Sequence, residues 1–172
     1  FSIFNASHFP AMRFDKSSIK ASAANRLGGT LNMELPEGLP MKTNGEFSIG
    51  PMSSQGTFRM PIGKSDALYV SLRAAYLNLL YGQWLKFDSD EIDYHFQDYN
   101  VTYLHKTKAE DKLWFNFYYG DDNVGMDEED TESTTLLKWK NLLSSIHWEH
   151  YTQNDTKITQ SIYLTRYNNR MG

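Results

Sequence analysis

The sequence predicts an all-β protein, built as an antiparallel up-and-down meander of the kind that forms part of a transmembrane β-barrel. Three observations support this prediction. Apolar and mixed positions alternate along residues 94–119, which is the period of a strand with two different faces. Aromatic residues make up 15% of the 172 residues although the mean hydropathy is -0.58, a combination expected when every second residue faces water. No apolar run approaches the ~20 residues that a membrane-spanning helix needs.

The alternation is clearest between Tyr94 and Tyr119, which have the pattern of one β-hairpin. Its arms are residues 98–107 and 112–120, joined by a polar turn at Lys108–Asp111. One face of the second arm carries four large side chains: Leu113, Phe115, Phe117 and Tyr119. The other face is mixed and carries Trp114, Asn116 and Tyr118. Such a strand suits a wall with lipid on one side and a wet lumen on the other.

The first part of the chain differs in composition from the rest. Residues 1–38 are rich in Ser, Ala and Asn, and they contain one short strand candidate at Thr30–Leu35. A group of residues that interrupt regular structure follows: Pro36, Gly38 and Pro40. We therefore divide the chain into residues 1–38 and residues 39–172. Because it begins at Phe1 without an initiator Met, we expect a piece of a longer protein.

After residue 39 the pattern predicts a series of strands. They are expected near 44–50, 55–62, 66–84, 96–107, 112–120, 136–152 and 157–168. A helix over residues 66–81 is the main alternative, since Leu and Ala favour helix. The connections alternate in length, as in outer-membrane barrels with short periplasmic turns and longer extracellular loops. The expected short turns are 63–65, 108–111 and 153–156, and the expected long loops lie near 85–95 and 121–135.

The order of these segments resembles the TonB-dependent outer-membrane receptors, at the end of their plug and the start of their barrel. Phe1–Asn5 and Asn25–Gly38 are similar to the closing part of a plug domain, with a Gly-rich turn and a short strand. Barrel-like segments then follow in the order of the family: Pro61–Asp66, Ser71–Tyr76, Tyr99–Tyr103, Phe117–Asp122 and Trp139–Trp148. The resemblance covers nearly the whole chain. Two departures are residues 21–24, which replace the usual run before Arg26, and the strand count, because the family's barrel has about 22 strands.

The resemblance implies a fold and a function. Residues 1–38 would be the C-terminal end of a plug domain, and residues 39–172 the N-terminal strands of the barrel. The parent protein would import a scarce nutrient, such as a chelated metal, a vitamin or a glycan, across the outer membrane of a Gram-negative bacterium. Its partners would be outer-membrane lipid and, through an N-terminal segment outside these residues, the TonB energy-coupling protein. The alternative is a small soluble β-barrel or sandwich that binds an apolar ligand; it places Leu113, Phe115 and Phe117 in a closed core.

Several function classes are disfavoured. The net charge of -4 and the lack of a basic patch argue against a nucleic-acid partner. No Gly-x-Ser-x-Gly, no His-Glu-x-x-His and no cysteine is present, so we expect neither an enzyme nor a cofactor. His147 and His150 stand three residues apart and would point to opposite faces of a strand, whereas His147 and Glu149 share a face but make an incomplete metal site. No metal site is expected.

The segment 121–132 is acidic and contains no basic residue. Its candidate ligand-binding residues are Asp121, Asp122, Asp127 and Glu128. Carboxylate oxygens can gather a cation or another ligand in an extracellular loop, or they can simply be solvated, and the spacing does not fit an EF-hand. Arginines inside predicted strands should face the lumen, where the guanidinium stays hydrated: Arg59, Arg73 and Arg166. Arg166 fits unevenly because it shares its face with Ile162 and Leu164.

Overall fold

The described part of the chain is mostly antiparallel β-structure. The computed structural model describes residues 5–16, 29–76, 86–87, 90–107, 111–128, 133–154 and 156–172. The N-terminal segment contains the 3₁₀ helix η1 (Ala6–His8) and the strands β1 (Met12–Asp15) and β2 (Thr30–Met33). The remaining strands are β3 (Asn44–Ile49), β4 (Ser53–Ile62), β5 (Asp66–Ala75), β6 (Lys86–Phe87), β7 (Asp90–Lys106), β8 (Lys112–Glu128), β9 (Ser133–Tyr151) and β10 (Lys157–Met171). Within these ranges, no helix is long and apolar enough to cross a membrane.

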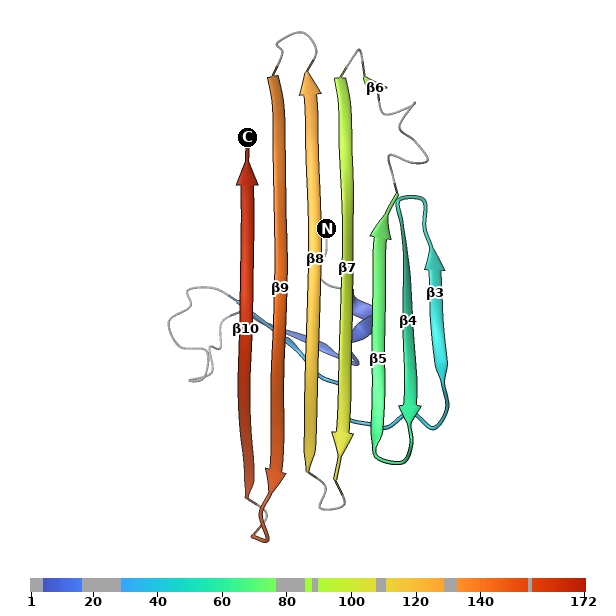
Figure 1. Cartoon of the computed structure of the whole chain (residues 1–172), viewed down its shortest axis with the longest axis vertical. Helices are drawn as coiled ribbons and strands as arrows, with labels where there is room; N and C mark the ends of the chain where they lie inside the picture. The colour runs from blue at the N-terminus through green and yellow to red at the C-terminus, as the bar shows by residue number, and fades with distance from the viewer. Residues whose placement is uncertain are drawn as a thin grey trace.

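Strands β3 to β10 form one antiparallel meander in the order β10-β9-β8-β7-β5-β4-β3, with the short β6 paired to β7 (Figure 1). This confirms the predicted fold class and the pairing of neighbours along the chain. It also rules out the alternative helix where the structure describes it, since β5 pairs with β4 over its whole length. Residues 77–81 of the alternative lie outside the described residues. β1 and β2 form a separate two-stranded sheet, and β1 was not predicted.

The long loops predicted near 85–95 and 121–135 were wrong in extent. β7 begins at Asp90 and β8 runs to Glu128, so these residues pair with each other, Glu91 opposite Asp127. Gly120 and the acidic residues after it were expected to end the strand, because Gly and Asp favour turns. Pairing with β7 on one side and β9 on the other overrides this local preference. The up-and-down connectivity predicts that 121–132 lies at the same end of the sheet as 85–95, away from 108–111, and the described residues of these segments agree, since Glu91 pairs with Asp127 at one end and Lys106 with Lys112 at the other.

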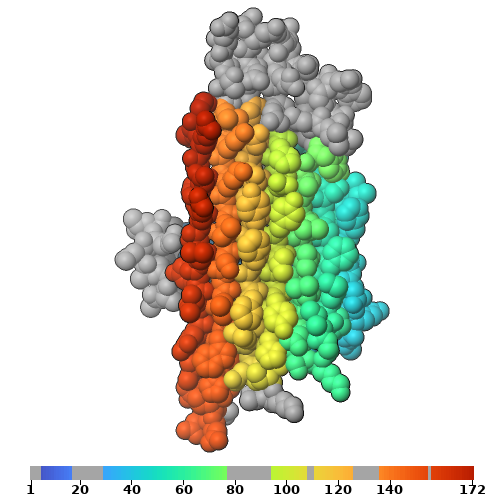
Figure 2. Space-filling view, in the orientation of Figure 1, coloured from blue at the N-terminus to red at the C-terminus, as the bar shows by residue number. Residues whose placement is uncertain are grey.

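The two faces of the large sheet differ in what covers them. The N-terminal segment crosses one face, behind the strands in Figure 1, and we call this the inner face; it carries Tyr69, Thr102 and Trp114. Figure 2 shows the opposite, outer face, over which no described part of the N-terminal segment passes. A small hydrophobic core lies on the inner face, where Leu35 of the N-terminal segment and Leu39 just after it pack on a buried cluster. Its members are Ala67, Tyr69, Leu104 and Trp114.

Candidate functional site

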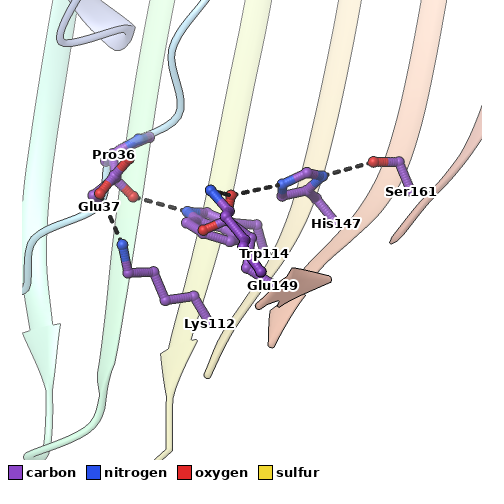
Figure 3. Close-up of polar contacts among 8 residues, drawn as sticks. Pro36, Glu37, Lys112, Trp114, His147, Glu149 and Ser161 are labelled. Atoms are coloured by element: carbon purple, nitrogen blue, oxygen red, sulfur yellow. Dashed lines mark hydrogen bonds and ion pairs between the residues drawn. The ribbon is translucent and has the colours of Figure 1, made fainter. Parts of the chain in front are cut away.

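The N-terminal segment is fixed to the inner face by side chains of the sheet (Figure 3). The Trp114 indole Nε1 donates a 2.8 Å hydrogen bond to the carbonyl oxygen of Pro36. Next to it, Lys112 Nζ lies 2.8 Å from Glu37 Oε2, and the Tyr69 hydroxyl donates to the carbonyl oxygen of Gly38. The Lys112 ammonium holds the pKa of Glu37 below its usual range. Residues 36–38 lie outside any strand, so their carbonyl groups need such donors from elsewhere.

A second group of polar side chains extends this contact toward β10. Figure 3 shows His147 between Glu149 and Ser161; its Nδ1 lies 2.6 Å from Ser161 Oγ and its Nε2 lies 3.5 Å from Glu149 Oε1. The His147 ring also packs against Trp114, with 5.1 Å between the ring centroids. Glu149 is paired with Lys157 Nζ at 2.6 Å. The inner face therefore carries one connected set of polar contacts across three strands.

A third set runs across the sheet from the 3₁₀ helix. His8 Nε2 lies 2.9 Å from Thr102 Oγ1, and Thr102 Oγ1 donates to Asn116 Oδ1 at 2.9 Å. Asn116 Nδ2 in turn donates to Ser145 Oγ at 3.2 Å. The register explains this ladder, because Thr102 stands opposite Asn116 and Asn116 stands opposite Ser145. Polar groups that are 1% exposed, as Thr102 is, are normally satisfied in this way.

The electrostatics of His8 follow from its burial against the inner face of the sheet. Burial, and after it the Arg59 guanidinium, together lower the pKa of His8 to about 4. The imidazole is therefore neutral at neutral pH. The Thr102 hydroxyl gives its one proton to Asn116, so it accepts from His8, and the proton of His8 must lie on Nε2. His8 Nδ1 is then an acceptor.

A chamber of about 340 Å³ lies between the N-terminal segment and the inner face. Its polar lining is formed mainly by strand residues: Asn100, Thr102, Asn116, Ser145, His147 and Ser161. Apolar side chains that line it include Phe9, Met33, Leu35 and Leu143. Polar and apolar groups therefore line the chamber together, since Leu143 shares its strand face with Ser145.

Further along the inner face, Arg73 and Asp98 form a buried ion pair. Arg73 Nε lies 2.6 Å from Asp98 Oδ2, and the guanidinium stands over the Phe96 ring at 4.9 Å. Gly120 stands opposite Asp98 and leaves room for the Tyr118 hydroxyl, since a Cβ at Gly120 would clash with it. The pair confirms the expectation that Arg73 faces the covered side of the sheet.

The structure does not bring the four predicted ligand-binding residues together. Asp121, Asp122, Asp127 and Glu128 all lie on β8, and alternation places Asp121 on the outer face and Asp122 on the inner face. Asp121 is paired with Lys140 at 3.1 Å. The side chains of Asp127 and Glu128 lie outside the described residues. The expected loop was wrong for residues 121–128, because β8 continues through them, while ligand binding by these four residues stays a prediction.

The histidines and arginines of the strands are placed largely as predicted. His147 and Glu149 share the inner face, while His150 lies on the outer face, with Nδ1 2.8 Å from Asp111 Oδ1. Among the described residues, no group of three His, Asp or Glu side chains is arranged to hold a metal ion. Arg59 contacts the carbonyl oxygen of Ser7 from the inner face. Arg166 was predicted wrongly, since the register of β10 is continuous and places it on the outer face opposite Leu142.

The outer face is apolar and exposed through the middle of the strands. Phe115 and Phe117 are 42% and 43% exposed. Tyr103 and Ile146 stand opposite Phe115, Val101 and Ser144 stand opposite Phe117, and Leu68 and Val70 continue this face on β5. The predicted division of β8 into two faces, with Leu113, Phe115 and Phe117 opposite Trp114 and Asn116, is confirmed.

Tyrosine hydroxyls border this apolar band at both ends. Toward the 107–111 turn, the Tyr103 hydroxyl donates a 2.6 Å hydrogen bond to Asp66. Toward the other end, the Tyr99 and Tyr119 rings pack together, and their hydroxyls bond to Gln97 at 3.0 Å and to Asp121 at 3.3 Å. Each ring thus lies over the apolar band with its polar tip directed away from the middle of the band. Aromatic residues placed in this way are typical of membrane–water interfaces.

Sequence reasoning missed the residues that hold the N-terminal segment. Trp114 bonds to Pro36 across 78 residues of chain, and His8 bonds to Thr102 across 94. No local sequence pattern marks these residues as partners. The available signal was a large Trp beside Asn116 on the mixed face of its strand.

In comparisons with known proteins, the chain matches no family model, no curated protein and no solved structure.

Proposed function

We propose that the chain forms part of the wall of a β-barrel in the outer membrane of a Gram-negative bacterium, with its N-terminal segment lying in the lumen as the end of a plug. The parent protein would be a TonB-dependent receptor that imports a scarce nutrient. Its partners would be outer-membrane lipid and the TonB energy-coupling protein. The observation that carries this proposal is that the two faces are inverted relative to a soluble sheet: the covered inner face carries polar side chains, and the exposed outer face carries apolar ones.

The inversion has a simple physical reason in a membrane. A soluble sheet buries its apolar face, because removing about 100 Å² of apolar surface from water is worth about 2.5 kcal/mol. Here Thr102 and Asn100 are 1% and 3% exposed, whereas Phe115 and Phe117 are more than 40% exposed. Lipid would remove the apolar band from water, and the tyrosine hydroxyls at its borders would lie at the headgroups.

The strand lengths support the same proposal. β7 and β8 have 17 residues each and β9 has 19, whereas a tilted strand needs about 9–11 residues to cross the bilayer. Strands β3 and β10 each have one neighbour among the described strands, so further strands of the barrel would pair there. The alternative soluble barrel with an apolar ligand is less consistent with the outward position of Phe115 and Phe117.

Single-cysteine labelling tests the proposal, because the chain contains no cysteine of its own. Phe115→Cys and Phe117→Cys would be labelled with an environment-sensitive dye in liposomes, with Thr165→Cys, an exposed position of the inner face, as the matched control. We expect blue-shifted emission that lipids carrying a nitroxide on the acyl chain quench at Phe115 and Phe117, but not at Thr165. Emission at Phe115 and Phe117 that a water-soluble iodide quenches instead would contradict the proposal.

A further inference from the structure

Four basic side chains lie together on the outer face, near the C-terminal end of β10 (Figure 1). They are Lys138, Lys140, Arg166 and Arg170, and we call them the outer basic cluster. Lys138 stands directly opposite Arg170 on the neighbouring strand, and Lys140 is the diagonal neighbour of both arginines. Long side chains in opposite and diagonal positions of one sheet face are within reach of each other. The four cationic groups can therefore converge on one ligand.

The outer basic cluster carries more positive charge than its neighbours neutralise. Asp121 is paired with Lys140 at 3.1 Å. With the other residues that the structure describes, Lys138, Arg166 and Arg170 make no ion pair. Four cations and one carboxylate leave three positive charges. Because like charges directly opposite on neighbouring strands destabilise a sheet, an anion between Lys138 and Arg170 would relieve their repulsion.

The cluster begins where the apolar band of the outer face ends. Arg166, Leu142, Tyr119 and Tyr99 stand in one row across four strands, and the two tyrosines border the band. Leu164 is the next outer-face residue of β10 toward the middle of the band. An arginine that faces lipid is costly at mid-depth of a bilayer but is tolerated near the headgroups. This level accounts for the outward position of Arg166, which the sequence analysis expected to face the lumen.

The charge and the position of the cluster together define the ligand. Arginine binds phosphate oxygens in pairs, and lysine adds a compact positive charge. A phosphomonoester carries about −1.5 to −2 charges at pH 7, so it neutralises more of the cluster than a single carboxylate or phosphodiester does. A soluble phosphate would contact the cations alone. An amphiphile with a phosphate beside its acyl chains would contact both the cations and the apolar band.

We propose that the outer basic cluster binds the phosphomonoester headgroup of a membrane lipid, whose acyl chains lie along the apolar band of β9 and β10. The phosphate would lie between Lys138 and Arg170, and Arg166 would contact the headgroup where it meets the chains. The inference rests on the proposed function, since the outer face must lie in a bilayer. It deepens that function by naming the headgroup that this part of the wall selects.

Cysteine labels on the whole 172-residue chain test the proposal in phosphatidylcholine vesicles. Asn168→Cys places a dye opposite Lys140, within the cluster, and Gln160→Cys places one on the same face toward the other end of β10. In separate samples a small fraction of phosphatidate, phosphatidylglycerol or phosphatidylcholine carries a nitroxide high on its acyl chain. Quenching of the dye by each lipid measures how strongly that lipid is enriched beside it.

We expect phosphatidate to be enriched roughly tenfold over phosphatidylcholine at Asn168, and phosphatidylglycerol to be enriched less. At Gln160 the three lipids should quench equally, because no basic cluster lies there. Equal quenching by the three lipids at Asn168 would overturn the proposal. So would an equal preference for phosphatidate at both positions, because the preference would then not belong to the cluster.

Two matched variants of the labelled chain locate the preference. Arg170→Gln should remove most of the phosphatidate enrichment at Asn168. Lys64→Gln removes the same charge from the turn between β4 and β5 and should leave the enrichment unchanged. An equal loss in both variants would mean that net charge alone attracts the lipid, which would overturn the proposal.

Lys138→Glu separates lipid binding from folding. It places opposite charges across from each other at Arg170, so the chain should resist urea at least as well as the original chain. The phosphatidate enrichment should nevertheless be lost, because the anion would meet a carboxylate. Enrichment that survives in Lys138→Glu would overturn the proposal.

Two further readings of the same samples separate the remaining outcomes. Inorganic phosphate at the concentration of the phosphatidate should displace little of it, since the bilayer holds the lipid headgroup beside the cluster. Complete displacement would assign the cluster to free phosphate and overturn the proposal. Quenching without any preference among the lipids refutes the lipid site but leaves the proposed function standing. Absence of quenching by every lipid at both positions refutes the proposed function, and this inference with it.

Discussion

Trp114 and Pro36 are joined by a 2.8 Å hydrogen bond from the indole Nε1 to the carbonyl oxygen, across 78 residues of chain. Trp114 is almost fully buried, so its N–H needs this acceptor, and Pro36 stands in a stretch that makes no strand. The contact is one of the few that fix the N-terminal segment on the sheet. The free energy that this hydrogen bond contributes can therefore be measured from the increase in local opening of the segment when the bond is removed.

We predict that Trp114→Phe loosens the segment around Pro36. Phe keeps the aromatic ring but cannot donate, so a buried carbonyl loses its partner at a cost of about 1–3 kcal/mol. Hydrogen exchange over residues 33–41 should become roughly tenfold faster, since 1.4 kcal/mol is a factor of ten. Trp148→Phe, on the outer face, is the control and should leave this exchange unchanged. Identical exchange in both variants would show that the bond does not hold the segment.

Docking of the same segment should also depend on pH through His8. Its pKa in the folded chain is about 4, below the ordinary value of 6.5, so the docked state holds the neutral form. The contribution of His8 is fully present above pH 6.5 and is lost as the pH falls from there to about 4. The total effect is on the order of 3 kcal/mol.

Protease sensitivity of the N-terminal segment between pH 7 and pH 4 measures this effect. The original chain should become markedly more sensitive over that range, while His8→Gln should change less because its amide does not titrate. The difference between the two chains isolates His8 from the other histidines. An identical pH dependence in both would mean that protonation of His8 does not oppose docking.

The strands and faces of the sheet were predictable from the sequence, but the contacts of the N-terminal segment with the inner face were not. Alternation assigned Phe115, Phe117 and Trp114 to the correct faces because the period of a strand is strict. The same pattern failed at Gly120, where pairing on both sides of β8 carries the strand through a local turn signal. Which carbonyl Trp114 would reach is set by the path of a segment far away in the chain. Alternation along β8 carries no information about that path.

The turn between β4 and β5 offers a test of backbone strain. Gly63 has φ of 70°, the left-handed region that a Cβ disfavours by about 1–2 kcal/mol. Gly63→Ala should lower the free energy of unfolding by that amount, while Gly63→Asn should lose less, because Asn tolerates this conformation. Gly38→Ala is the control, since a Cβ there meets nothing within 4 Å. Urea titration in micelles compares the three, and an Ala variant as stable as the Asn variant would contradict the assignment.

Replacing only Arg73 of the Arg73–Asp98 ion pair should lower the free energy of unfolding more than replacing both residues. Asp98 is 2% exposed, so Arg73→Met leaves a buried carboxylate without its counter-charge, at a cost of about 3–5 kcal/mol. Replacing both, as Arg73→Met with Asp98→Leu, removes the charge and the need for its partner together. We therefore expect the double variant to be more stable than Arg73→Met alone, because the desolvation of one carboxylate outweighs the packing lost with the other side chain. Urea unfolding of the four chains gives the coupling energy, and additive losses in the double variant would show that the two charges do not stabilise each other.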